Sequence, residues 1–427
     1  MTISPSNNGW VKKYFSLIKN YESVLNKFPG NVLNTEELIY AILQPTGFLY
    51  GHPTGFIFLD NSYLSKFTEE EALKILLLEG LVLVDYINCG NLNHENLELT
   101  IDKFVEFYES TNLEKAKKSW LNFSKLDTCG KLESIISQRV EIKGNITDKF
   151  ITNFLSNGLL FHDLILYYNY VDEKYKGNLV DKRAEILLDL VKVVAVAAHA
   201  DGQISDEEKG VFKLFLASAN LGNEKKEIAE KFFENNKTLK DIDFSENSYF
   251  STNSWLLNRY VLEMAILTIW SDKGVTQSEK NFLNELTVSL RLKAEDKDNS
   301  YIAIQTFVLN NQTNALFLNG KNDVEIILSG ASKRWAKILG RNKDKLASEL
   351  KQSKELVGLI TKSSIKELTK EEKEKVKTQF YDLAKTIPSL ALFMLPGGAV
   401  ILPVVLKIIP NLVPSAFVSN KIDNEEE

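Results

Sequence analysis

Apolar side chains recur at spacings of three and four residues along most of this chain. Between residues 9 and 30, for example, Trp10, Tyr14 and Ile18 belong to one such stripe. This spacing places apolar groups on a single face of an α-helix. The strict alternation of apolar and polar residues that is typical of β-strands is scarce. The pattern therefore predicts an all-α, multi-domain helical protein.

Sequence signatures of helix starts support this fold class. A capping box pairs a Ser or Thr at the N-cap with a Glu three residues later, and each side chain satisfies a backbone N–H of the other residue. Four such pairs precede apolar helical stripes: Thr68 with Glu71, Ser205 with Glu208, Thr276 with Glu279, and Thr369 with Glu372.

The most unusual stretch lies near the C-terminus. No charged residue occurs in the 21 positions from Thr386 to Leu406, and a membrane-spanning helix needs about 20 residues. Prolines interrupt the stretch and disfavour helix at the residue before them. Two interpretations stay open: a kinked membrane segment, or a helical hairpin buried in a core or at an interface. The residues that define the segment are Thr386, Pro388, Pro396, Gly397, Gly398, Pro403, Leu406, Pro410 and Pro414.

The spaced prolines give this stretch a family resemblance. Ile387-Pro388, Ile401-Leu402-Pro403 and the run from Pro410 to Phe417 resemble the start of the LETM domain. That family comprises leucine-zipper and EF-hand-containing transmembrane proteins of the mitochondrial inner membrane. The likeness covers residues 331–420. It implies an apolar segment that crosses a membrane, followed by a ribosome-binding-like region. Because the chain ends ten residues after Phe417, we expect most of that region to be absent.

Charge is distributed unevenly around the apolar stretch. The 427 residues carry a net charge of −6, yet residues 331–386 hold 15 Lys and Arg against 8 Asp and Glu. A basic block beside an apolar run fits the positive-inside rule, and an ordinary solvated helix face would show the same pattern. A cluster beside Trp335 is a candidate contact for RNA or anionic lipid. Its members are Lys333, Arg334, Lys337 and Arg341.

An acidic pattern occurs twice in the middle of the chain. Asp201 to Glu208 and Asp272 to Glu279 both follow the pattern D-x-x-[IV]-[ST]-x-x-E after an apolar helical stretch. These units resemble the two helical halves of the TerB-like fold, and the likeness covers about residues 180–295. One interpretation is a helix–corner–helix device, because the capping boxes and Gly202 suit such a corner. The other, implied by the resemblance, is a divalent-cation site that brings both aspartates together, with calcium or magnesium suited to oxygen ligands. The four candidate ligands are Asp201, Glu208, Asp272 and Glu279.

Catalytic and secretory signals are missing from the sequence. Only Cys89 and Cys129 occur, which suggests a reducing compartment. The four histidines are far apart, and no metal-ligand spacing, nucleophile–base set or phosphate loop appears. The N-terminus has no apolar signal-peptide core. We therefore expect a non-enzymatic protein.

With both likenesses in one chain, the sequence resembles the LETM-related, biofilm-associated type of bacterial protein. We expect an adaptor on the cytoplasmic side of the inner membrane, with the membrane and either the ribosome or a protein as partners and no DNA contact. A cation/proton transport component and a soluble, cytoplasmic ribosome-associated factor are the alternatives. The expected organisation is an N-terminal helical region at 1–180, a TerB-like domain at 181–300, a connector at 301–330, a LETM-like segment at 331–420 with its apolar run at 386–417, and an acidic tail at 421–427.

Overall fold

The fold is built from helices throughout the part of the chain that the structure describes. A computed structural model covers the 427 residues. In the described ranges the regular elements are α-helices and short 3-10 helices, and no strand occurs there. The predicted all-α class is therefore confirmed. The described residues are 3–18, 24, 33–89, 97–111, 126–141, 159–172, 182–202, 204, 206–245, 248–251, 254–269, 276–310, 335–336, 339–363, 366–386 and 398–418.

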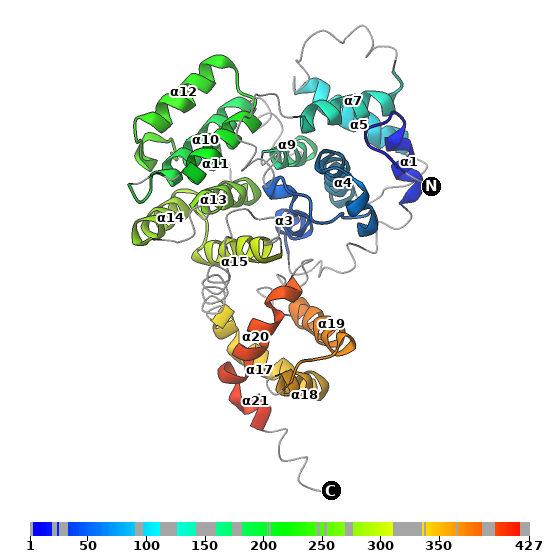
Figure 1. Ribbon diagram of the computed structural model, residues 1–427, viewed down its shortest axis with the longest axis vertical. Coiled ribbons are helices and arrows are strands. Elements are labelled where there is room, and N and C mark those ends of the chain that lie inside the picture. Colours follow the sequence, from blue (N-terminus) through cyan, green and yellow to red (C-terminus); the bar gives the residue numbers. More distant parts are fainter. Residues whose placement is uncertain are drawn as a thin grey trace. The chain divides into compact units, whose positions relative to one another are not determined.

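The chain divides into two compact units (Figure 1). Unit 1 consists of Met1–Leu25 and Thr35–Lys297, and unit 2 consists of Asn26–Asn34 and Asp298–Glu427. Helix α15, Ala294–Asn310, contains the division between them.

Unit 1 holds most of the helices. Helix α4 packs on α7 and α9, whereas α10 packs on α11, α12 and α13. Figure 1 shows α10, α11 and α12 grouped together in green. Among the described residues, the α-helices that precede α15 are α1 Trp10–Leu17, α3 Thr35–Leu43, α4 Glu69–Cys89, α5 Leu97–Ser110, α7 Thr128–Val140, α9 Phe161–Val171, α10 Arg183–Ala198, α11 Asp206–Ser218, α12 Asn223–Glu234, α13 Trp255–Ile269 and α14 Gln277–Ser289. The 3-10 helices are η1 Gln44–Thr46, η2 Phe48–Tyr50, η3 Asn61–Lys66, η6 Leu239–Asp241 and η7 Tyr249–Ser251.

A buried carboxylate in α4 fixes the loop before this helix, an aromatic segment that contains Phe56 and Phe58. The backbone amides of Ile57, Phe58 and Leu59 donate to the two carboxylate oxygens of Glu79 at 2.5, 3.1 and 2.7 Å. The hydroxyl of Tyr14 in α1 adds a fourth hydrogen bond at 3.3 Å. Buried backbone N–H groups need partners, and Glu79 supplies them to a loop that has no regular structure at this point. The aromatic segment is therefore a packed structural loop.

In the described part of unit 2, five α-helices follow α15. Helix α18 packs on α17, α19 and α20, and α21 packs on α17, α18 and α20. These helices are α17 Lys343–Gln352, α18 Lys354–Ser363, α19 Lys370–Thr386, α20 Gly398–Leu412 and α21 Pro414–Val418.

Candidate functional site

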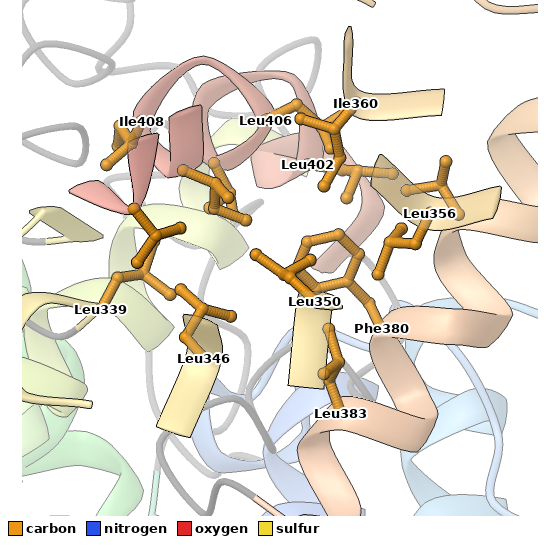
Figure 2. Packing of buried hydrophobic residues seen from close by; sticks show 14 of the residues in the cluster. Leu339, Leu346, Leu350, Leu356, Ile360, Phe380, Leu383, Leu402, Leu406 and Ile408 are labelled. Carbon is orange, nitrogen blue, oxygen red and sulfur yellow. The ribbon is translucent and has the colours of Figure 1, made fainter. Parts of the chain in front are cut away.

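The candidate site is unit 2, because the basic block and the apolar run of the sequence both belong to it. Its helices enclose one hydrophobic core (Figure 2). Helix α17 contributes Leu346 and Leu350, which are four residues apart and therefore lie on one helix face. Further side chains come from the other helices, among them Leu356 and Ile360 of α18, Phe380 and Leu383 of α19, and Leu402, Leu406 and Ile408 of α20.

The described half of the apolar run is part of this core. Val405 and Ile409 of α20 are fully buried, whereas Lys407 and Asn411 are exposed. Each pair is spaced by four residues, so α20 has an apolar face toward the core and a polar face outward. This packing agrees with the buried interpretation for residues 402–417. In the described ranges, no helix is both long enough and apolar enough to cross a membrane.

The prolines of the run affect the helices less than expected. Pro403 and Pro410 lie inside α20, which continues through both of them. Pro414 is the first residue of α21, a position whose N–H would have no partner in the helix. Helix α19 ends at Thr386, and α20 begins at Gly398. Pro388, Pro396 and Gly397 lie outside the described residues.

Polar contacts join α18 and α19 on the outside of unit 2. Glu355 accepts from Nζ of Lys375 at 2.9 Å and from Nε2 of Gln379 at 2.7 Å. Gln379 in turn accepts from the hydroxyl of Ser353 at 2.9 Å. The hydrogen bond and the charge of Lys375 lower the pKa of the Glu355 carboxyl, so both groups are ionised at neutral pH.

The predicted basic cluster is described only in part. Arg341 is exposed and pairs with Asp298 at 2.8 Å. Trp335, beside which the cluster was placed, is 1% exposed and belongs to the core. Its ring is therefore packed inside the unit and is not presented to a nucleic-acid base. Lys333, Arg334 and Lys337 lie outside the described residues.

Other lysines are exposed on the described surface of unit 2. They face solvent in α17 and α19, at the start of α18, in the segment before α19 and in α20. The exposed lysines are Lys343, Lys345, Lys351, Lys354, Lys366, Lys370, Lys373, Lys375 and Lys407. All of these lysines except Lys407 belong to the basic block that the sequence shows at residues 331–386, which extends well beyond the cluster around Trp335.

The acidic repeat shows helix capping in its second unit. Thr276 Oγ1 accepts from the Glu279 amide at 3.2 Å, and the Glu279 carboxylate accepts from the Thr276 amide at 2.5 Å. This reciprocal pair is the capping box expected at the start of α14. In the first unit, Gly202 has a φ of +83°, a left-handed conformation that glycine adopts at low cost and that suits the expected corner.

Three of the four proposed cation ligands lie among the described residues. Asp201 is half-buried and Glu208 is 2% exposed, whereas Asp272 lies outside the described residues. Among the side chains that are described, no three from His, Cys, Asp and Glu converge on a point where a metal ion could bind. The capping role of Glu279 is thus the one function that the described contacts assign to this set.

Comparison with known proteins found a family likeness at the end of the chain. Residues 368–427 match the family model described as LETM1-like, RBD. This part of the chain is LETM-like. No curated protein and no solved structure matches the chain. The matched residues include α19, α20 and α21, so the LETM-like segment supplies much of the unit 2 core.

Proposed function

We propose that this protein is a non-enzymatic adaptor that binds the ribosome through unit 2. The observation that carries the proposal is the match of residues 368–427 to a ribosome-binding domain (RBD) of the LETM1-like family. The matched residues lie in a unit with an apolar interior and a lysine-rich exterior. Such an arrangement leaves the charged groups of a folded unit available to a partner.

The charge of unit 2 supports a partner rich in phosphate. Residues 331–386 have an excess of seven positive charges, although the chain as a whole is acidic. Ribosomal RNA presents a dense array of phosphates, and lysines that neutralise them release bound counterions. Binding of this type weakens as salt concentration rises. The acidic remainder of the chain would be repelled by RNA, which favours contact through unit 2 alone.

Co-sedimentation with purified ribosomes tests this proposal. The full chain should pellet with ribosomes at low salt and return to the supernatant as salt concentration increases. A chain that stays in the supernatant at low salt, while remaining folded, would refute ribosome binding. The acidic protein bovine serum albumin serves as the control for trapping in the pellet.

A further inference from the structure

The first turn of α9 in unit 1 carries two adjacent buried polar side chains with different surroundings. Asp163 is fully buried and has a complete set of partners. Arg139 donates to its two oxygens from Nε and Nη2, both at 2.7 Å, and the hydroxyl of Tyr108 donates at 3.2 Å. This bidentate pair balances the charge of Arg139. Asp163 therefore needs no further ligand.

His162, the neighbouring residue, has no comparable contacts. Its side chain is 1% exposed, and neither ring nitrogen has a hydrogen-bond partner in the described part of the chain. The buried Nε of Arg183, at the start of α10, likewise has no partner there. A buried donor or acceptor without a partner costs about 1–3 kcal/mol. Each such group in a native protein calls for an explanation, and one explanation is that the group binds an ion.

The charges around these two residues do not balance. The groups that act electrostatically on Arg183 include Arg139 and Asp163, so two guanidinium groups and one carboxylate lie near one another. Burial, followed by the charge of Arg139, lowers the pKa of Arg183 to about 10, and Arg183 is thus still charged at neutral pH. Burial, followed by the charge of Arg183, lowers the pKa of His162 to about 3, which leaves His162 neutral. Among the groups in the described part of the chain that act on Arg183, one positive charge has no counter-charge, and a buried charge is costly without one.

We propose that His162 and Arg183 form a binding site for a phosphate group. A guanidinium fork suits a phosphate, and a neutral imidazole can donate one hydrogen bond to it. The helix dipole adds to the attraction, because His162 lies in the first turn of the 11-residue helix α9. The site belongs to unit 1 and is independent of the proposed ribosome contact in unit 2. Inorganic phosphate and a small phosphate monoester share the chemistry that the site recognises.

Isothermal titration of the full chain with inorganic phosphate tests the site, with sodium chloride keeping the ionic strength constant. The wild-type chain should bind phosphate saturably, and Arg183→Gln should weaken binding about tenfold or more because the charged fork is lost. Lys182→Gln is the matched control. It removes one positive charge from the adjacent exposed residue, whose ammonium lies over the ring of Tyr249. This control should bind like the wild type. No saturable binding by the wild type, or equal weakening by both variants, would overturn the proposal.

Nuclear magnetic resonance of the histidine rings gives a second measurement on the unmodified chain. Phosphate should shift the ring nitrogen signals of His162 and leave those of His52, His94 and His199 in place. Unchanged His162 signals at saturating phosphate would overturn the assignment even if phosphate binds elsewhere. Titration with glycerol 3-phosphate then distinguishes a phosphate monoester from inorganic phosphate as the ligand. An affinity for glycerol 3-phosphate equal to that for inorganic phosphate indicates a monoester ligand, and a much weaker one indicates the inorganic ion. Both outcomes uphold a phosphate site.

Discussion

The hydroxyl of Tyr50 donates a hydrogen bond to the carboxylate of Glu263 at 2.8 Å, although 213 residues separate them in the sequence. Tyr40 donates to the other oxygen of Glu263, and Arg259 Nε donates to that oxygen at 2.9 Å. All four side chains are buried. The network joins the N-terminal helical region to the helix that leads into the second acidic repeat. Both regions lie in unit 1, so we expect them to unfold together.

Glu263→Gln should destabilise unit 1 by about 3 kcal/mol, because removal of one partner leaves the buried Arg259 charge poorly compensated. Chemical denaturation of the full chain, followed by circular dichroism, measures the change. Glu227→Gln is the matched control, since Glu227 pairs with Lys231 at 4.0 Å on the surface. The control should lose less than about 1 kcal/mol. Similar losses in the two variants would show that the buried network contributes no more than a surface pair.

Glu79 should make unit 1 less stable as pH rises from about 4.5 to 7. Burial raises the pKa of Glu79 from its ordinary value of 4.5 to about 7, against four hydrogen-bond donors that lower it. The folded state therefore retains a proton that the unfolded state has released. The stabilisation from this group is complete at low pH and is lost as pH rises through 7. By linkage, the loss is about 3 kcal/mol.

The measurement for Glu79 is the free energy of unfolding at several pH values between 4.5 and 7.5, in the wild type and in Glu79→Gln. The variant should be less stable at low pH, because an amide cannot replace all the acceptors that the loop amides use. Its stability should also vary less over this range, because the titrating group is gone. Identical pH dependence in the two proteins would contradict the prediction.

The helix-corner and cation interpretations of the acidic repeat make different predictions for Glu279→Gln. If the residue only caps α14, the variant should lose less than about 1 kcal/mol, with or without divalent cations, because the Gln amide oxygen can still accept from the Thr276 amide. Thermal denaturation in calcium, in magnesium and in chelator measures this. We expect the same loss in all three conditions, since the carboxylate is already occupied by the Thr276 amide. A loss that occurs only with a divalent cation would support the metal site.

Removal of α20 and α21 should disrupt unit 2. A chain that ends at Lys385 loses the buried side chains of α20, and each apolar side chain that is no longer buried costs about 1.5–3 kcal/mol. Amide hydrogen exchange in α17, α18 and α19 should become much faster than in a matched chain that ends at Val418. Unchanged protection in these three helices would show that they fold without α20.

Fractionation of cells that express these chains tests the membrane interpretation directly. If the apolar run serves as an anchor, the chain that ends at Val418 should pellet with membranes and require detergent for release, and the chain that ends at Lys385 should not. If the run serves only as core, the longer chain should not need detergent.

Local features of the fold could be predicted from the sequence. The capping boxes at Thr68, Thr276 and Thr369 all occur as expected, because each depends on side chains three residues apart. The helical class follows from apolar spacing for the same reason. Long-range pairs such as Tyr50 with Glu263 could not be predicted, since no local pattern links positions so far apart.

The role of the apolar run could not be decided from hydropathy. A membrane helix and a core helix are both rich in Leu, Ile and Val, so composition does not separate them. One signal was available, because Lys407 and Asn411 are four residues apart and mark a polar face on α20. The candidate phosphate site was also missed: His162 and Arg183 are 21 positions apart, and the burial of the His162 ring and of the Arg183 Nε is known only from the structure.

The affinity of the full chain for purified ribosomes tests the central claim most directly. The dissociation constant should be compared between two triple variants of equal charge change. One neutralises the exposed unit 2 residues Lys370, Lys373 and Lys407 to Gln, and the other neutralises the exposed unit 1 residues Lys209, Lys226 and Lys231 to Gln. We predict about tenfold weaker binding or more for the unit 2 variant and little change for the unit 1 variant. Equal affinity of the two variants, or no binding by the wild type, would contradict a ribosome contact through the LETM-like unit.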